Sequence, residues 1–331
     1  MSASQKSSLA VVLGVNGQDG GYLAEALMDR GRPVSGVGRQ SGPASGLVGL
    51  HEYRRLDLTR PKEVERTLLE TEPATIFHFA AIHKSGGAAL DDVASDAFQV
   101  NVASVQTSLD YARRRIVAGA PSPRIIYASS SRVFGAPLAG AITEAHPLRP
   151  NDYYGVTKKL ACELIDFYRS AHGVDAAAIH FFNHESARRP EDYFIPTLTS
   201  SVISALAGAP RSEIPQVRSL DFHCDWGDAA EYMDLVARFA EAPSIQDCLL
   251  ATGSTWRAQD LAEALFAAFG LDWRDWLDAE PTAPAPAPFE ADPSRFARIA
   301  GARPTRTILE LCVDLVRAAG ADAQRGAALA P

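Results

Sequence analysis

The chain has 331 residues, of which 47% are hydrophobic, and its 32 Lys and Arg against 40 Asp and Glu give a net charge of −8 at pH 7. This acidic balance excludes proteins that wrap nucleic acid or lie on an anionic membrane, because both need a basic face. The four cysteines, Cys162, Cys224, Cys248 and Cys312, have no metal-ligand spacing, so we expect no metal site and a reducing, cytoplasmic location. The first apolar run, residues 9–15, is too short for a signal peptide or a membrane span.

The first half of the chain alternates short apolar runs with longer amphipathic segments. The strand-like runs are 9–13, 33–38, 53–58, 75–81, 124–129 and 176–182, and the helical patterns are 20–30, 61–72, 94–115 and 153–172. Strands separated by helices of this length predict βαβ units. We therefore expect an α/β fold with a doubly wound parallel sheet of the Rossmann type.

The alternation weakens after residue 183. Helices are predicted at 198–208, 228–241, 258–269 and 308–319, strands at 216–220 and 248–252, and an extended Ala/Pro tract at 279–288. We expect residues 1–182 to form the Rossmann domain, to which 222–252 returns. Residues 183–221 and 253–331 are then predicted to form a smaller, mostly helical substrate-binding domain.

A glycine-rich turn follows the first predicted strand. Glycines at three-residue spacing let the backbone approach a dinucleotide pyrophosphate, and the helix that follows supplies free N–H groups. The alternative is an ordinary glycine-rich turn, but its place at the first strand–helix junction of a βαβ series favours the dinucleotide. The candidate cofactor-binding residues here are Gly14, Asn16, Gly17, Gln18, Asp19 and Gly20.

The end of the second strand indicates which dinucleotide binds. NAD-binding folds usually carry an acid there for the ribose 2′-OH, whereas this chain has Arg39, and a guanidinium pairs well with a 2′-phosphate. We therefore favour NADP(H), the alternative being a solvated surface arginine. Asp57 and Leu58 are expected beside the adenine. Ala80 and Ala81 are expected to let the cofactor pass close to the backbone.

A tyrosine and a lysine four residues apart form the candidate catalytic centre. Tyr154 and Lys158 share one face of a predicted helix, where the ammonium is expected to lower the pKa of the phenol. Tyr154 would then act as acid and base towards a hydroxyl that loses hydride to a nicotinamide. Ser130, at the end of the fifth predicted strand, would hold the same oxygen.

These features together resemble the extended short-chain dehydrogenase/reductase superfamily and, more closely, the GDP-mannose 4,6-dehydratase family. The supporting stretches are GVNGQDGGYL at 14–23, YGVTK at 154–158, NHESARR at 183–189, DWG at 225–227 and LATG at 250–253. The similarity runs from about residue 9 to 319. NHES followed by two arginines is the most discriminating of these stretches.

The resemblance implies an activity and a set of site residues. The substrate would be a nucleotide-linked hexose, most simply a GDP-linked one, and its C4 would be oxidised by tightly held NADP. Water would then be lost across C5 and C6, and the hydride would be returned to C6. It also implies a homodimer or homotetramer. The implied catalytic residues are Ser130, in a place usually taken by Thr, Tyr154 and Lys158, and the last two also touch the cofactor. His184 and Arg189 are implied at the cofactor. Ser131, Arg132 and Asn183 are implied at the substrate.

The sequence departs from the family pattern at the catalytic base. The family's Glu, which takes the C5 proton, is Arg132 here, and a guanidinium is not deprotonated at ordinary pH. Loss of a positioned base costs about 10²–10⁴-fold. Whole-chain similarity therefore indicates a 4,6-dehydratase, while Arg132 favours a keto-sugar reductase or epimerase. A non-enzymatic NADP sensor is a further alternative, against which the intact Tyr154 and Lys158 argue.

The substrate end has few of the family's basic groups. Thr197 and Cys224 stand where basic residues are expected, and the Ala/Pro tract with Glu290 replaces an Arg-Pro-x-Glu stretch. His83 or Lys84 could reach the sugar. The remaining candidates to bind an anionic substrate are Arg132, Arg188, Arg189, Arg211 and Arg218, at least half of which we expect to be surface or ion-paired charges.

Overall fold

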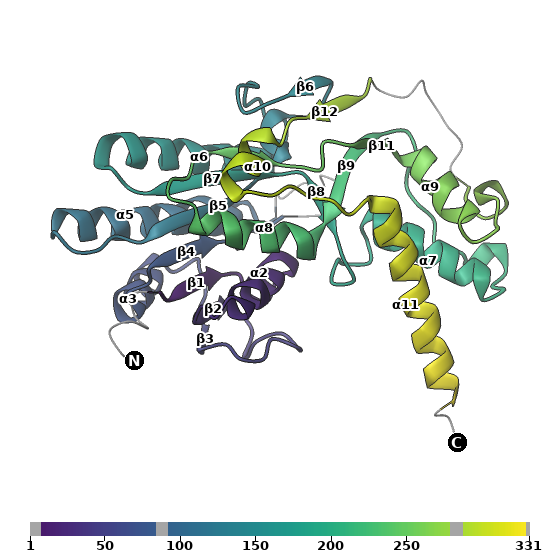
Figure 1. Cartoon of the computed structure of the whole chain (residues 1–331), viewed down its shortest axis with the longest axis horizontal. Coiled ribbons are helices and arrows are strands. Elements are labelled where there is room, and N and C mark those ends of the chain that lie inside the picture. Colours follow the sequence, from purple (N-terminus) through teal and green to yellow (C-terminus); the bar gives the residue numbers. More distant parts are fainter. Residues whose placement is uncertain (1–7, 84–91, 279–286, 329–331) are drawn as a thin grey trace.

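Seven parallel strands form the central sheet of the computed structural model, which describes residues 8–83, 92–278 and 287–328 (Figure 1). The strand order is β10-β7-β5-β4-β1-β2-β3. The bounds are β1 Ala10–Leu13, β2 Val34–Gly38, β3 Glu52–Arg55, β4 Thr75–His78, β5 Arg124–Ser130, β7 Ala176–Phe181 and β10 Cys248–Leu250. The predicted doubly wound parallel sheet is confirmed.

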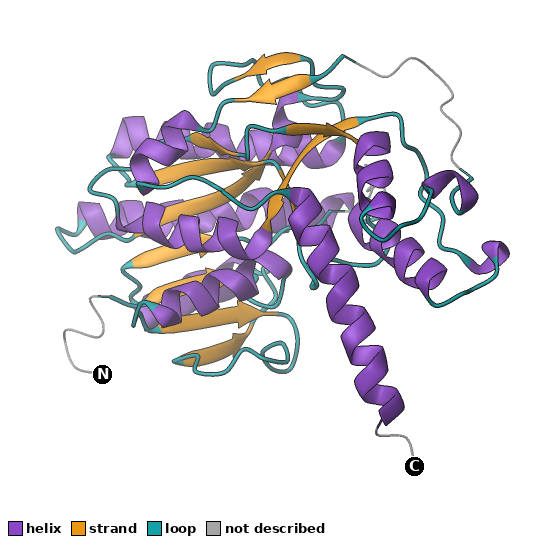
Figure 2. Cartoon of the chain, turned by 45° about the vertical axis from the view of Figure 1, so that its right-hand side comes forward, coloured by secondary structure: helices purple, strands orange, loops and turns teal. Residues whose placement is uncertain are grey.

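Helices cover both faces of this sheet (Figure 2). Successive strand residues point to opposite faces, so Val11 and Ile76 enter one core while Val12 and Phe77 enter the other. The helices of the first core are α3 Pro61–Thr71, α5 Ser104–Val117 and α6 Tyr153–His172, and those of the second are α2 Gln18–Asp29, α8 Ala229–Glu241 and α10 Ser294–Ala300.

The predicted helix over 94–115 is broken. It consists of α4 Ala94–Phe98, a π-helical turn Gln99–Ala103, and α5. π-helical turns are found frequently at functional sites. Here the turn carries the buried Asn101, whose side chain accepts a hydrogen bond from the Ile82 amide and donates one to the Ile82 carbonyl.

The C-terminal part adds two small sheets and a third core. β8 Asn183–Glu185, β9 His223–Asp228 and β11 Thr255–Arg257 form one sheet, and β6 Gly140–Ile142 pairs with β12 Phe289–Ala291. The helices here are α7 Phe194–Leu206, α9 Ala258–Ala267 and α11 Ile308–Ala328, with short 3₁₀ turns at Arg211–Glu213 and Trp273–Asp275. A further 3₁₀ turn, Ser131–Phe134, directly follows β5 of the central sheet.

Two sequence predictions in this part are wrong. No strand forms at 216–220, where Val217 and Leu220 are buried from an irregular segment, and the strand lies instead at His223–Asp228. The last helix does not end near 319 but continues to Ala328. The greater part of the Ala/Pro tract, 279–286, lies outside the described residues, as does Lys84.

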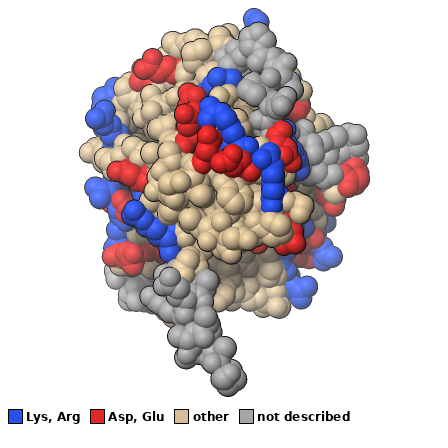
Figure 3. Space-filling model, turned by 90° about the vertical axis from the view of Figure 1, so that its right-hand side faces the viewer, with Lys and Arg blue, Asp and Glu red and all other residues tan. Residues whose placement is uncertain are grey.

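Acidic and basic side chains lie next to one another on the face shown in Figure 3. The ion pairs of the C-terminal part include Arg211–Asp278 and Arg274–Asp272. In the part of the chain that the structure describes, no helix combines the length and apolar composition needed to cross a membrane.

Candidate functional site

A cavity of about 1680 Å³ opens at the carboxyl ends of β1, β2, β4 and β5. Its wall continues onto β8, α7 and the loop before β9, so the sheet and the C-terminal part line it together. In doubly wound folds ligands bind outside the carboxyl ends of the strands. The predicted site residues from Gly14 to Arg189 therefore meet in one place, with Asp57 as the exception.

The glycine-rich turn is shaped for close backbone approach. Gly14 has φ +92°, and a Cβ there would lie 2.7 Å from the Ala80 backbone. At Gly20 a Cβ would lie 2.2 Å from the Gly14 carbonyl oxygen. Gly17 then caps α2, whose first-turn N–H groups have no intrahelical acceptor. This cradle fits the pyrophosphate of a dinucleotide.

Asn16 and Arg39 define the adenosine end of the cavity. The side chain of Asn16 accepts a hydrogen bond from the Ala44 amide and donates one to the Gly42 carbonyl. It thereby holds the loop that follows Arg39. Arg39 is exposed at the cavity wall, and the structure pairs its guanidinium with no carboxylate among the described residues.

The other predicted cofactor contacts divide into two groups. Leu58, Ala80 and Ala81 line the cavity. Asp57 does not: its carboxylate accepts hydrogen bonds from the amide and hydroxyl of Thr59, which turn the chain into α3. These bonds lower the pKa of Asp57.

Ser130, Tyr154 and Lys158 converge on one point of the wall. Tyr154 is half-buried on the cavity wall beside Ser130, whose hydroxyl oxygen accepts a hydrogen bond from the Arg132 amide. Lys158 lies one helical turn further along α6, and its ammonium donates a 2.6 Å bond to the Ala128 carbonyl. Its Nζ lies 5.5 Å from the Tyr154 ring centroid.

Burial, rather than the nearby lysine, decides the direction of the Tyr154 pKa shift. It raises the pKa of Tyr154 above its ordinary value, and the Ser130 hydroxyl offsets only part of that effect. Burial also lowers the pKa of Lys158 to about 8, so the ammonium stays mostly protonated near pH 7. Desolvation of the phenolate therefore outweighs the nearby ammonium.

An Asp–His pair joins the glycine-rich turn to β8. His184 Nε2 lies 2.9 Å from the Asp19 carboxylate, and its Nδ1 lies 2.8 Å from the Phe182 carbonyl. Because both ring nitrogens face acceptors, the imidazolium form is favoured. Burial opposes both charges, yet the pair lowers the pKa of Asp19 and raises that of His184. Gln18 supports the pair by accepting a hydrogen bond from Ser186.

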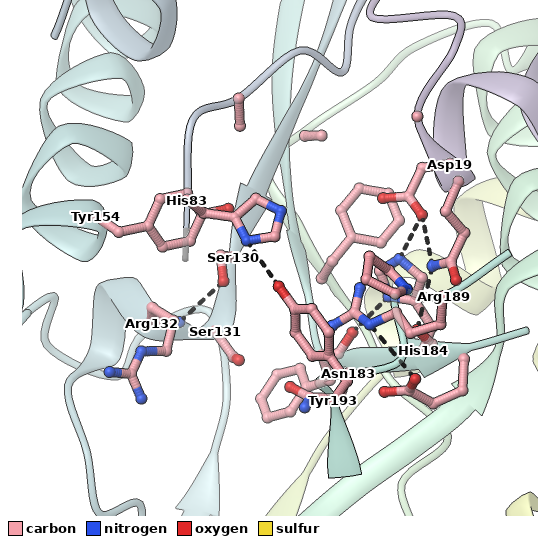
Figure 4. Close-up of a pocket in the computed structure, with 18 of the residues that line it drawn as sticks. Asp19, His83, Ser130, Ser131, Arg132, Tyr154, Asn183, His184, Arg189 and Tyr193 are labelled. Atoms are coloured by element: carbon pink, nitrogen blue, oxygen red, sulfur yellow. Dashed lines mark hydrogen bonds and ion pairs between the residues drawn. The ribbon is translucent and has the colours of Figure 1, made fainter. Parts of the chain in front are cut away.

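A second chain of contacts runs from Glu185 to Tyr154, and Figure 4 labels its members Arg189, Tyr193 and His83. The buried carboxylate of Glu185 lies 3.4 Å from Arg189, whose guanidinium stacks 3.8 Å from the Tyr193 ring centroid. The Tyr193 hydroxyl is 3.0 Å from His83 Nδ1, and the His83 ring lies 5.6 Å from that of Tyr154. Burial raises the pKa of Glu185 to about 7.

Arg132 is engaged by an acid that the sequence analysis did not single out. Its guanidinium forms an ion pair with Asp152, and in Figure 4 it points away from Tyr154. Asp152 is also the N-cap of α6, accepting a hydrogen bond from the Gly155 amide. Arg132 lines the cavity, as do its neighbour Ser131 and Asn183, but its charge is neutralised.

Of the remaining arginine candidates among the described residues, Arg188, Arg189 and Arg218 line the cavity, and the first two are ion-paired. Arg188 forms an ion pair with Glu25, and its guanidinium stacks on the Tyr22 ring, so it is not a free cation. Arg211 lies outside the cavity and binds Asp278. Arg189 and Arg218 line the cavity, as do the uncharged Thr197 and Cys224 at positions where basic residues were expected.

Asn101 is the positioning residue that sequence reasoning missed. Besides fixing Ile82, its amide donates a 3.0 Å hydrogen bond to Thr157, between Tyr154 and Lys158 on α6. It thus ties the segment after β4, at Ile82, to α6, which carries Tyr154 and Lys158. An asparagine inside an otherwise apolar helical pattern was the available signal. Among the described residues, no cluster of His, Cys, Asp and Glu is arranged to hold a metal ion.

Comparisons with known proteins agree with this geometry. A family model described as GDP-mannose 4,6 dehydratase matches residues 11–297. The chain is 27% identical over 276 residues to GDP-mannose 4,6-dehydratase of Sinorhizobium fredii, covering 80% of this chain and 77% of that one. It is 29% identical over 285 residues to GDP-mannose 4,6-dehydratase sdnI of Sordaria araneosa, covering 84% of this chain and 51% of the relative. The match thus spans about half the length of that relative.

Solved structures share the fold over almost the whole chain. dTDP-glucose 4,6-dehydratase from Bacillus anthracis in complex with NAD superposes with a TM-score of 0.75 at 15% identity, covering 93% of this chain and 95% of that one. RMD from Pseudomonas aeruginosa complexed with NADPH gives 0.75 at 18% identity, covering 94% and 98%.

Proposed function

Because the chain belongs to the GDP-mannose 4,6-dehydratase family, we propose that it is an NADP(H)-dependent enzyme that acts by hydride transfer at C4 of a nucleotide-diphosphate hexose, a GDP-linked one first of all. The observation that supports this most is the convergence of Ser130, Tyr154 and Lys158 on the cavity that the glycine-rich turn also lines. When bound there, a nicotinamide dinucleotide supplies the hydride acceptor and donor. Four free cysteines agree with the proposed cytoplasmic location.

The chain's own groups would manage the proton of the C4 hydroxyl. The Ser130 hydroxyl and the Tyr154 phenol hold the sugar oxygen between them. In the reductive direction the phenol gives its proton to that oxygen as C4 receives the hydride, and in the oxidative direction the phenolate takes it back. Lys158, fixed by the Ala128 carbonyl, keeps a positive charge behind this phenol. The pair Asp19–His184 and the stacked Arg189 hold the neighbouring wall in place.

The choice of NADP over NAD depends on Arg39. Asn16 holds the loop after Arg39 from within the glycine-rich turn, so the turn and the guanidinium are linked. An exposed guanidinium is free to form charge-assisted bonds with a 2′-phosphate. The two solved neighbours named above carry NAD in one case and NADPH in the other.

The net reaction is proposed to be reduction or epimerisation of a 4-keto sugar rather than dehydration. Arg132 cannot take the C5 proton, and its ion pair with Asp152 turns it away from Tyr154. Dehydration, the activity in the names of the relatives, is the second candidate. The division into a cofactor domain (1–182 with 222–252) and a substrate domain (183–221 with 253–331) stays a prediction.

A second copy of the chain is proposed to cover the outer face of α6. Tyr153, Val156, Leu160 and Phe167 are 37–55% exposed there and fall at helical spacing along one stripe. Contiguous exposed apolar surface of this kind marks interfaces. This agrees with the homodimer or homotetramer that the family resemblance implies.

Ligand-induced thermal stabilisation tests the proposed function. A ligand at a hundredfold excess over its Kd raises the free energy of unfolding by about 2.7 kcal/mol, which is a readily measured shift in Tm. We expect NADP to raise the Tm more than NAD does, and GDP-mannose to raise it further in the presence of NADP. UDP-glucose and dTDP-glucose serve as controls for the base. No shift with either dinucleotide would contradict the proposal.

A further inference from the structure

We propose that His83 is a catalytic residue that moves the proton on a carbon next to the C4 ketone of the sugar, the task that Arg132 cannot perform. The inference rests on the proposed function, since it needs a 4-keto sugar in the cavity. It adds a group outside the Ser130, Tyr154 and Lys158 centre.

His83 stands beside the atoms that would hold the sugar. Its ring centroid lies 5.6 Å from that of Tyr154, on the cavity wall, and Figure 4 shows the two rings side by side above Ser130. A ketone oxygen held by Tyr154 and Ser130 places C4 next to them. C3 and C5 are one bond further, in the part of the cavity that His83 faces.

The imidazole is fixed at one nitrogen and open at the other. Nδ1 is 3.0 Å from the Tyr193 hydroxyl, while Nε2 has no hydrogen-bond partner in the described part of the chain. Tyr193 is itself held by the guanidinium of Arg189. The backbone before His83 is clamped by Asn101, which binds both the N–H and the carbonyl of Ile82. A ring held in this way presents Nε2 at a defined position.

The charges around His83 favour the neutral imidazole that a base requires. Burial lowers its pKa, and the cations Arg189 and Lys158 lower it further, while Asp19 and Asp192 act in the opposite direction. Three acids on this wall are ion-paired: Asp19 with His184, Glu185 with Arg189, and Asp152 with Arg132.

The proton step balances without a further reagent. The C–H bond beside the C4 carbonyl breaks, its electron pair forms the C=C bond of the enolate, and the proton goes to Nε2 to give an imidazolium. Return of that proton to the same face of the carbon restores the ketone with its original configuration, and in D₂O the imidazolium returns a deuteron instead. Nothing is oxidised or reduced in this step. Tyr193 stabilises the ring but exchanges no atom with the sugar.

Deuterium exchange tests this assignment separately from hydride transfer. GDP-4-keto-6-deoxy-mannose is incubated in D₂O with the full-length protein and NADP, and loss of the C3 and C5 proton signals is followed by NMR. We expect exchange with the wild type and a loss of about 100-fold in His83→Gln, the usual contribution of such a group. His51→Gln, an exposed histidine outside the cavity, should exchange like the wild type.

The outcomes separate the two proposals. Exchange within tenfold of wild type in His83→Gln, or no exchange in the wild type, would overturn the role of His83. An equal loss of exchange and of nicotinamide reduction with GDP-mannose would also overturn it, because His83 would then act only through Tyr154. Unchanged Tm in the variant shows that it folds. Absence of nicotinamide reduction in the wild type would instead refute the proposed function, whatever the exchange result.

Discussion

The guanidinium of Arg132 is ion-paired with the carboxylate of Asp152, the residue that caps the helix carrying Tyr154 and Lys158. Arg132, at which the family resemblance implies a base, is thus part of the support of the helix that carries Tyr154 and Lys158. The ion pair with Asp152 also explains how an arginine is accommodated at position 132 of the cavity wall. The positive charge of Arg132 is met by the carboxylate of Asp152, and their side chains are 38% and 18% exposed, respectively.

The first prediction concerns that pair. Arg132→Glu alone places a carboxylate beside Asp152, and we expect it to lower the free energy of unfolding by on the order of 1 kcal/mol, as loss of a cap interaction does. Arg132→Glu/Asp152→Asn removes the repulsion while Asn still caps the helix. In this double variant, formation of the 4-keto-6-deoxy product from GDP-mannose should rise at least about tenfold, measured by mass spectrometry.

Arg132→Gln/Asp152→Asn is the matched control, because it also removes the ion pair between positions 132 and 152 but places no carboxylate at position 132. Equal product from the two double variants would show that a carboxylate at 132 does not act on the sugar.

The second prediction concerns cofactor choice. Arg39→Gln removes the proposed charge-assisted bond to the 2′-phosphate, which is worth about 1.5–3 kcal/mol. The Kd for NADP, measured by titration calorimetry, should therefore rise roughly tenfold or more while the Kd for NAD stays the same. Arg66→Gln, on the exposed side of α3, controls for loss of a positive charge. A parallel change in both constants would contradict the role given to Arg39.

The third prediction is a pH dependence of stability that arises from Glu185. Burial raises its pKa from the ordinary 4.5 to about 7. Because the folded state holds this proton more tightly, the carboxyl adds stability below about pH 4.5 that is lost as the pH rises through 7. Between pH 5 and 8, the free energy of unfolding of the wild type should fall relative to that of Glu185→Gln.

Urea unfolding at several pH values measures that difference. Glu191→Gln, an exposed neighbour, should give a curve parallel to that of the wild type. Parallel curves for Glu185→Gln as well would mean that the carboxyl titrates normally.

The fourth prediction concerns assembly. Leu160→Glu places a charge in the exposed apolar stripe of α6, 37% exposed in the single chain. We expect sedimentation to show an oligomer for the wild type and a monomer for this variant. Leu69→Glu, also exposed but on α3, is the control and should leave the oligomer intact. A monomeric wild type would refute the proposed interface.

The fold was predictable where local pattern and packing agree. The buried parallel strands are short apolar runs, and the helices between them carry one apolar face. The prediction failed at His223–Asp228, whose polar residues carry no β pattern and pair with β8 and β11 from distant parts of the sequence. It also failed at Val217 and Leu220, which are apolar because an irregular loop buries them.

The site was predictable where its residues are close in sequence. Tyr154 and Lys158 share a helix face at a spacing of four, and Ser130 ends a strand. The contacts that tune them join residues far apart: Asp19 with His184, and His83 with Tyr193. The sign of the Tyr154 pKa shift followed from burial, which a sequence spacing does not report.

Single-turnover reduction of the bound nicotinamide tests the central claim most directly. Wild-type protein loaded with NADP and mixed with GDP-mannose should give the absorbance of NADPH. Tyr154→Phe should bind NADP with unchanged Kd and give none. Tyr168→Phe, on the same helix but bonded to Asp110, is the control. Reduction that persists in Tyr154→Phe, or is absent from the wild type, would contradict the account.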